Sequence, residues 1–304
     1  MNTQYLHEFV CLAETRNFWE ASEQLYMNQS TLSKHLKALE AELGVPLFAR
    51  TTRHVELTAY GRAYLPYARA ITRSELEGCA ALKRLQNMEN GLLSIGTIPS
   101  MPQYRITQLL ARFQEQYPDI TIRITEDDSR NLPEYLLNGS CELIFHREEL
   151  HAPDPLLPDD DRICRIPYLT DRMVAVLPAA HPLAKASEVT LQELSGSQFC
   201  FIREGSLMYE ISMTACRNAG FVPDILFSSH HIASLLDMIR NRNCVGLLMD
   251  RHVMEPPENA GWTAVPLKPE IRSRISLCYR TDKPLSAAAQ EFLDFYIKWT
   301  GHLM

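Results

Sequence analysis

The sequence predicts a multidomain α/β protein with an N-terminal winged helix-turn-helix, one long helix, and a larger part built from two α/β units. Three observations predict this fold class. Short amphipathic segments separated by turns fill the first 44 residues, an apolar repeat then runs from residue 58 to about 90, and beyond it short apolar strands alternate with helical segments. A chain of 304 residues has room for two or three domains of about 100–200 residues each.

The first 44 residues carry three helix patterns. Asn17 opens a capping-box-like segment, NFWE, and Asn28 is suited to cap a third helix that Gly44 ends. Ala21 and Ser22 are small enough for a close crossing, and two helices joined by about three residues form a helix-turn-helix. Apolar residues recur at helical spacing in all three: Leu6, Phe9, Val10 and Ala13; Phe18, Ala21 and Leu25; Leu32, Leu36, Leu39 and Leu43.

A β-wing and a long helix are expected next. Val55 and Leu57 alternate with polar residues as in a short strand, with Arg50 and Arg53 near the tip of the wing. Thr58 can then cap a helix that runs to Asn90. A helix of this length cannot bury its apolar stripe within one small domain, so we expect a dimer seam along it.

From residue 92 the order of elements becomes strand, helix, strand, helix, strand, which predicts a parallel sheet. A second α/β unit follows a Pro/Asp-rich loop at 152–161. The expected strands are 92–98, 120–124, 141–145, 173–177, 198–202, 224–228, 245–249, 262–267 and 273–280, and a closing helix carries Phe292, Phe295, Tyr296 and Trp299.

The charge is unevenly distributed. The chain carries a net −7, but residues 1–90 hold ten Lys/Arg and ten Asp/Glu, and seven bases against three acids lie in 29–73. This pattern fits a DNA-binding module joined to an acidic partner domain. No apolar run reaches the roughly 18 residues of a membrane span, and the N-terminus is not a secretory signal, so we expect a cytoplasmic protein without membrane contact.

The segments FWEASEQL (18–25), QSTLSKHLKALEAELGVPLF (29–48) and LTxxG (57–61) resemble the LysR-type transcriptional regulators. The resemblance implies a winged helix-turn-helix (1–58), a dimerising linker helix (59–90), and an effector domain similar to a periplasmic binding protein. Its two lobes are expected at 91–165 with 268–304, and at 166–267, with the chain crossing near 163–168 and 265–269. It also implies a homotetramer on promoter DNA, with RNA polymerase as a further candidate partner.

The third helix is expected to enter the major groove of double-stranded promoter DNA. Gln29 suits adenine, Lys34 suits guanine, and Thr31 can present its methyl group to thymine. Ser30, Ser33 and Lys37 suit phosphates, and Arg50 and Arg53 suit phosphates or the minor groove. Trp19, Glu20, Ser30 and Lys34 depart from frequent family residues, so the base preference need not follow the commonest pattern.

A small-molecule effector is expected at the carboxyl ends of the strands. The resemblance implies that positions such as Ser100 and Gly246 line the pocket, while His146, Arg147 and Arg203 favour a carboxylate or similar anion. Asp127 and Asp128 weigh against a purely anionic site. The candidate effector contacts are Ser100, Met101, Ser129, His146, Phe201, Arg203, Ser229, His230, His231 and Gly246.

Other functions have weaker support. Enzyme motifs such as HExxH, GxSxG and the P-loop are missing, so we expect no catalytic residues and no cofactor. Adjacent histidines on a strand point to opposite faces, so His230 and His231 do not indicate a metal site. The eight cysteines lack metal-ligand spacing and indicate reduced thiols. The remaining alternative is a thiol-switched regulator of the same fold that uses Cys200 and Cys216.

Overall fold

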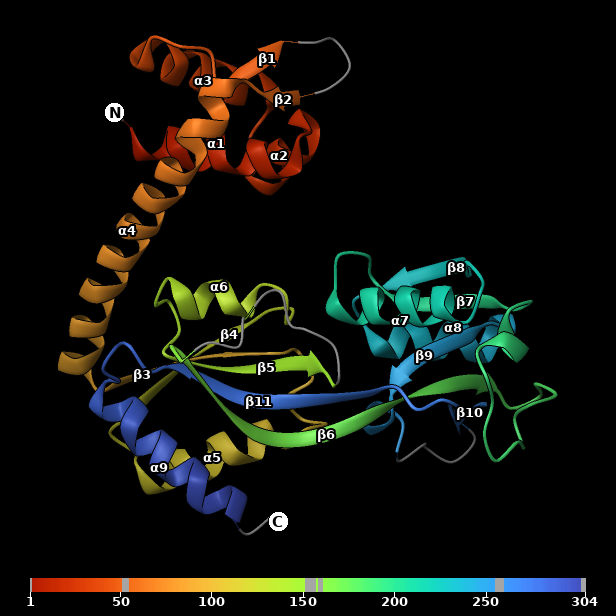
Figure 1. The fold of residues 1–304 in the computed structure, drawn as a ribbon. Helices are drawn as coiled ribbons and strands as arrows, with labels where there is room; N and C mark the ends of the chain where they lie inside the picture. The colour runs from red at the N-terminus through yellow and green to blue at the C-terminus, as the bar shows by residue number, and fades with distance from the viewer. Residues whose placement is uncertain (1, 51–54, 151–156, 158–160, 255–259, 302–304) are drawn as a thin grey trace. The chain divides into compact units, whose positions relative to one another are not determined.

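The computed structural model describes residues 2–50, 55–150, 157, 161–254 and 260–301 (Figure 1). The chain divides into two compact units, residues 1–83 and 84–304, and each is described by itself. The expected helix-turn-helix lies in the first unit, and the expected α/β part forms the second.

The three N-terminal helices are α1 (Thr3–Thr15), α2 (Phe18–Gln24) and α3 (Gln29–Leu43). Each begins at an asparagine whose side chain accepts a backbone N–H: Asn2 from Gln4, Asn17 from Trp19 and Asn28 from Thr31. These caps satisfy N–H groups that have no partner inside a helix. Gly44 ends α3 with φ 72°, a conformation that costs glycine little.

The helices pack through their predicted apolar faces. Ala21 is fully buried and Ser22 nearly so, which confirms the close crossing expected of small residues. The wing follows as β1 (Phe48–Arg50) and β2 (Val55–Leu57), which pair antiparallel. Arg53 lies outside the described residues. The core of this unit includes Leu6, Phe9, Leu12, Leu32, Leu36, Leu39 and Leu47.

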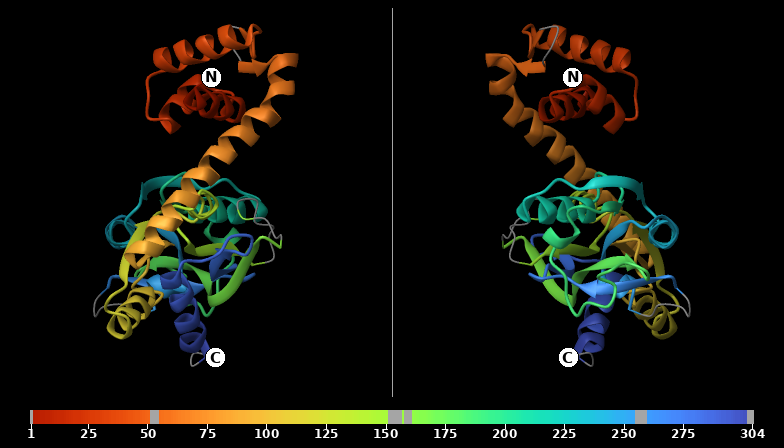
Figure 2. Two further views of the ribbon diagram at one scale, coloured as in Figure 1. Left: turned by 90° about the vertical axis from the view of Figure 1, so that its left-hand side faces the viewer. Right: turned by 90° about the vertical axis from the view of Figure 1, so that its right-hand side faces the viewer.

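The long helix α4 (Ala59–Asn90) is continuous in both views of Figure 2 and contains Pro66. Its first half belongs to the first unit, because Ala68 is fully buried in that core. Gly61 makes this packing possible, since a Cβ there would lie 2.1 Å from the main-chain oxygen of Leu47. The unit boundary falls near residue 83, inside the helix expected as a separate linker at 59–90, and contacts of this helix with α1 extend to Glu75, which accepts from Thr3 and lies 3.1 Å from His7.

The first lobe of the second unit has the predicted parallel order. Strands β3 (Leu92–Thr97), β4 (Thr121–Glu126) and β5 (Leu143–Glu149) are connected by α5 (Ile106–Gln116) and α6 (Leu132–Leu137). The sheet order is β4-β3-β5-β11-β6, with β11 (Arg272–Arg280) and β6 (Ile163–Pro178) antiparallel. In Figure 1, α5 and α9 (Ala287–Gly301) lie on one face and α6 on the other.

The second lobe repeats this arrangement. It contains β7 (Gln198–Ile202), α7 (Leu207–Asn218), β8 (Asp224–Ser229), α8 (Ile232–Arg242), β9 (Val245–Met249) and β10 (Trp262–Pro266), with short 3-10 helices η1 (Gln192–Leu194) and η2 (Asp250–His252). The order is β8-β7-β9-β6-β10, and β7, β8 and β9 are parallel. The carboxyl ends of the three parallel strands of each lobe therefore face the other lobe, with β6 shared between the two sheets.

The chain crosses between the lobes later than the sequence analysis placed it. Residues Ile163–Arg172 of β6 still pair with β11 of the first lobe, and pairing with β9 starts only at Met173. The expected crossing at 163–168 is therefore wrong, because one strand serves both sheets (Figure 1). The return crossing follows Leu267, which still bridges to Val189, and precedes Arg272. Within the described residues, no helix combines the length and apolarity that a membrane crossing needs.

Candidate functional site

The N-terminal half of α3 presents a polar surface. Gln29, Ser30, Lys34 and Lys37 are exposed, while Thr31 and Ser33 are half-buried. The hydroxyl of Ser30 donates to the capping side chain of Asn28 at a distance of 2.7 Å. The Ser30 hydroxyl proton is therefore already used in a local hydrogen bond. The side chain of Arg50 is outside the described part of the molecule.

A hydrogen-bonded contact between His35 and the buried Glu8 joins α3 to α1. The His35 ring nitrogen Nδ1 lies 2.9 and 3.0 Å from the two carboxylate oxygens of Glu8, whose side chain is 1% exposed. Tyr5 stacks on the same imidazole with ring centroids 4.6 Å apart. The exposed residues of α3 thus stand on a helix whose orientation is set from beneath.

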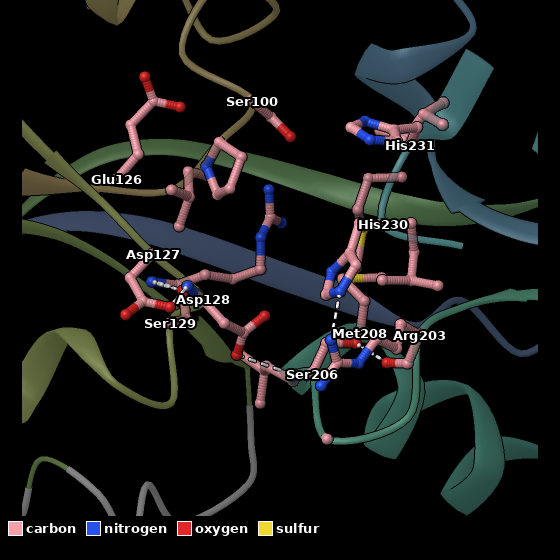
Figure 3. A pocket seen from close by; sticks show the side chains of 18 of the residues that line it. Ser100, Glu126, Asp127, Asp128, Ser129, Arg203, Ser206, Met208, His230 and His231 are labelled. Carbon is pink, nitrogen blue, oxygen red and sulfur yellow. Dashed lines mark hydrogen bonds between the residues drawn. The ribbon is translucent and has the colours of Figure 1, made fainter. Parts of the chain in front are cut away.

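The second unit holds a pocket of about 510 Å³ at the carboxyl ends of β3, β4, β5, β7, β8 and β9 (Figure 3). This is the place where open α/β sheets usually bind ligands. Five of the ten expected effector contacts line it: Ser100, Ser129, Arg203, His230 and His231.

The other five expected contacts do not line this pocket. Phe201 is fully buried in the second-lobe core, and Met101 packs on the first-lobe core. His146 is an internal strand residue with 1% exposure, because pairing with β11 extends β5 to Glu149. Gly246 provides room for α8, since a Cβ there would lie 2.5 Å from Cδ1 of Ile239. Ser229 contacts a pocket residue instead: its hydroxyl oxygen accepts the backbone N–H of His231.

The loop after β3 is long. Ser100 and Met101 form turns in it, and α5 begins at Ile106. Tyr104, in the same loop, is fully buried. The long loop places the Ser100 hydroxyl 3.0 Å from Nε2 of His252 on the second lobe.

A buried charge cluster lies beneath the pocket. Arg147 is 4% exposed and its Nη1 donates to both carboxylate oxygens of Asp171, each at 2.9 Å. The hydroxyls of Tyr104 and Ser273 also donate to Asp171, each at a distance of 2.5 Å. Arg147 contacts Ser273 as well. Arg147 lies over the Tyr104 ring, 4.9 Å from its centroid. This cluster joins four separate segments of the chain through one carboxylate.

His252 borders the pocket beside this cluster. Burial, together with the nearby cation of Arg147, lowers the pKa of His252 to about 4. Its ring meets Tyr104 edge-on, with centroids 5.7 Å apart. The imidazole is therefore neutral at pH 7 and serves the pocket as a polar but uncharged group.

The first-lobe wall of the pocket is acidic. Asp127 accepts hydrogen bonds from the Tyr135 hydroxyl at 2.7 Å, from the Asn131 side chain at 2.9 Å and from the Asp128 backbone at 2.7 Å. Partial burial opposes ionisation, but these bonds outweigh it and lower the pKa of Asp127. Asp128 reaches the second lobe and accepts the backbone N–H of Leu207 at 3.0 Å.

The second-lobe wall carries the cation. Arg203 Nη1 lies 2.6 Å from Nε2 of His230. Because arginine only donates, the His230 nitrogen accepts this bond, which leaves Nδ1–H as a donor. Ser206 caps α7 by accepting the N–H of Tyr209. Figure 3 shows Arg203, His230 and His231 across the pocket from Glu126, Asp127 and Asp128.

Sequence reasoning missed Tyr104, Asp171, His252 and Ser273 as parts of this region. Asp171 lies inside β6 and Ser273 inside β11, so neither follows a strand end. A polar residue within an apolar strand was the one available signal, because an ionised side chain in a core requires a partner. The sequence could not say which residue that partner is.

Two cysteines meet in the second lobe. The Sγ atoms of Cys200 and Cys244 lie 2.8 Å apart and both residues are fully buried. Cys216, the partner that the sequence analysis considered for Cys200, packs in a different cluster with Phe199 and Phe201. Alternation along β7 sends Cys200 to the opposite face, so the pairing with Cys216 is wrong. Among the described residues, no group of three or more His, Cys, Asp or Glu is placed to hold a metal ion.

Comparisons with known proteins cover both units. Residues 3–62 match the family described as "Bacterial regulatory helix-turn-helix protein, lysR family", and residues 86–300 match "LysR substrate binding domain". The transcriptional regulator YwbI of Bacillus subtilis is 30% identical over 97% of this chain and 95% of its own length. OxyR of Escherichia coli, a DNA-binding dual regulator, is 26% identical over 97% and 94%. The structure of HinK from Pseudomonas aeruginosa is 25% identical, with a TM-score of 0.55 over 100% and 99% of the two chains.

Proposed function

The chain belongs to the LysR family of transcriptional regulators, and from this premise we propose that it binds promoter DNA through α3 and that a small molecule in the pocket between its lobes controls this binding. The observation that carries the proposal is the pocket of about 510 Å³ at the carboxyl ends of two sets of three parallel strands, in a chain that also carries a helix-turn-helix. Such a regulator needs no catalytic residue, and it acts in the cytoplasm, where promoter DNA is.

The DNA half of the proposal assigns roles along α3. Gln29 and Lys34 are exposed and suited to base edges, and Thr31 to a thymine methyl group. Ser30, Ser33 and Lys37, with the wing residues Arg50 and Arg53, are proposed to contact phosphates. The exposed residues Tyr60, Tyr67 and Leu82 on α4 support a dimer through this helix, and we propose the tetramer typical of the family.

In vitro selection with the full chain would identify the DNA sequence that it binds. Measuring the affinity for this DNA at several salt concentrations would then test the roles proposed for the α3 residues. Lys34→Gln should weaken binding and reduce the slope of log affinity against log salt by up to about one, because one phosphate or base-edge cation is lost. Arg73→Gln, which removes an exposed cation of α4, is the matched control. Equal slopes for all three proteins would contradict the role of α3.

The effector half is tested by a thermal-shift screen of metabolites, because a ligand at 100 times its Kd adds about 2.7 kcal/mol of stability. A hit should alter the DNA footprint of the wild type. Arg203→Gln should lose that response while keeping ligand-free DNA affinity, and Arg112→Gln, outside the pocket, should keep both. A hit that stabilises the protein but leaves the footprint unchanged in the wild type would overturn control by the pocket.

A second candidate function, the thiol-switched regulator, is favoured by the Cys200–Cys244 contact. The hydrogen bond with Cys200 lowers the pKa of the Cys244 thiol, which makes Cys244 the member of the pair that reacts as a thiolate. Hydrogen peroxide is the proposed oxidant: two thiols and one peroxide give one disulfide and two waters. Related proteins of Pectobacterium and Dickeya are named hydrogen peroxide-inducible genes activator.

Mass spectrometry after mild peroxide treatment separates the two candidates. A Cys200–Cys244 cross-linked peptide, absent from Cys244→Ser and kept in Cys216→Ser, together with a changed footprint, would support the thiol switch. Intact thiols at Cys200 and Cys244 would remove it.

A further inference from the structure

The pocket is electrostatically divided between its two lobes, and this division bears on the ligand. The first-lobe wall carries Glu126, Asp127 and Asp128, and the second-lobe wall carries Arg203 with His230 and His231 (Figure 3). A volume of about 510 Å³ is in the range of small-metabolite sites.

The cation on the loop of the acidic wall, Arg130, is engaged by the second lobe: its Nη1 donates to the main-chain oxygen of Gly205 at 3.2 Å and lies 3.5 Å from Glu210 Oε1. In the described part of the chain, the hydrogen bonds to Asp127 and Asp128 all come from neutral donors: a tyrosine hydroxyl, an amide side chain and backbone N–H groups. Glu126 is exposed on the same wall. Arg147 does not neutralise these carboxylates, because its guanidinium is held by Asp171 at 2.9 Å. The wall therefore presents negative charge to the pocket.

The opposite wall can hold an anion. Arg203 is exposed, and its Nη1 donates to Nε2 of His230 rather than to a carboxylate. Helix α8 starts next to Arg203, and its N-cap residue, His231, makes no side-chain cap hydrogen bond. The first N–H groups of α8, at the positive end of its dipole, can therefore bind an anion. Among the described residues that line this wall, Glu204 is the acid, and it is exposed beside Arg203.

A purely anionic ligand would fit one wall and be repelled by the other, and a purely cationic ligand would have the reverse difficulty. We infer that the pocket accepts a zwitterion of the α-amino acid type, whose ammonium group lies against Glu126, Asp127 and Asp128 and whose carboxylate lies against Arg203, His230 and α8. This inference rests on the proposed effector function and refines the anionic ligand expected from the sequence by adding a required positive group.

The test is isothermal titration of the full chain with the twenty standard L-α-amino acids, each compared with its 2-oxo acid and its decarboxylated amine. At least one amino acid should bind, and its two analogues, which each lack one charge, should bind at least about tenfold more weakly, as expected for the loss of one charge-assisted hydrogen bond. An analogue that binds as tightly as its parent amino acid would overturn the inference, as would a panel in which no amino acid binds.

Two charge-removing variants assign the walls. Glu126→Gln should weaken binding of the amino acid about tenfold and spare the 2-oxo acid, while Arg203→Gln should weaken both and spare the amine. Glu134→Gln on α6 and Arg112→Gln on α5, both exposed and outside the pocket, are the matched controls and should change neither affinity. If both pocket variants bind all three ligands as the wild type does, the assignment of the walls is wrong.

Failure of this inference is distinguishable from failure of the proposed function. A ligand of another charge type that still alters the DNA footprint through the pocket would refute the zwitterion and leave the effector function standing. An amino acid that binds as described but leaves the footprint unchanged would support the zwitterion and refute the effector function.

Discussion

Removing the cation of the buried Arg147–Asp171 pair should destabilise the second unit. Arg147→Met keeps most of the side-chain length but leaves the Asp171 carboxylate, 1% exposed, without a positive partner. Breaking a buried ion pair by removing one member typically costs about 3–5 kcal/mol, because an uncompensated charge remains buried. Asp171 would keep the hydroxyls of Tyr104 and Ser273 as donors, so we expect the lower end, about 3 kcal/mol.

The double variant Arg147→Met/Asp171→Asn is the decisive comparison. The hydroxyls of Tyr104 and Ser273 bond different oxygens of Asp171, so the amide oxygen of the asparagine can keep one of these two bonds, and no net charge stays buried. We therefore expect the double variant to lose less than Arg147→Met alone, with a coupling of about 2 kcal/mol or more between the two sites. The single variant Asp171→Asn should be costly as well, because it leaves the guanidinium of Arg147 buried without a counter-charge.

Urea unfolding followed by tryptophan fluorescence measures these differences. The chain has three tryptophans, and a Trp19→Phe background leaves Trp262 in the second lobe and Trp299 in the first as reporters of the second unit. Urea is preferred to a guanidinium salt, which would screen the charges under study. A loss below about 1 kcal/mol for Arg147→Met at an unchanged slope, or strictly additive single losses, would refute the reasoning.

Two further predictions follow from residues beside the sites. With a pKa of about 4 in the folded chain against about 6.5 when unfolded, His252 contributes stability that is fully present above pH 6.5 and lost as the pH falls toward 4. Between pH 7 and pH 4 the wild type should lose about 3 kcal/mol more than His252→Gln in urea unfolding, and parallel pH profiles would show that the imidazole is not buried as described. Gly61→Ala should destabilise the first unit by about 1–3 kcal/mol or more and weaken DNA binding, because its Cβ meets the main-chain oxygen of Leu47. A Cβ at Gly78 on the same helix would have no atom within 4 Å, so Gly78→Ala should stabilise the helix by up to about 1 kcal/mol. Thermal denaturation measures both variants, and equal melting temperatures would contradict this packing argument.

The DNA-binding unit could be predicted closely from the sequence because its signals are local. The spacing of Leu32, Leu36 and Leu39 defines a helix face within one segment, and Asn17 and Asn28 cap the helices that follow them directly. Hydrogen bonds and side-chain contacts over three to four residues determine these features, so no distant part of the chain is needed to specify them.

The pocket was only half predictable, because strand ends are local and side-chain directions are not. The sequence indicated which strands end near one another, and Ser100, Ser129, Arg203, His230 and His231 do lie there. It could not show that β5 continues past His146, since that depends on pairing with β11, more than a hundred residues later.

What the sequence by itself determined about this protein is therefore the order and type of its elements, the helix-turn-helix and the family. Only the tertiary structure decided which polar side chains come together: the charges of Arg147 and Asp171, the thiols of Cys200 and Cys244, and the acidic wall opposite Arg203. The physical reason is that these contacts join residues 24 and 44 positions apart in the chain, or residues on separate lobes. Periodicity and capping act within a few residues, whereas the partner of a buried charge or thiol is chosen by how whole sheets pack.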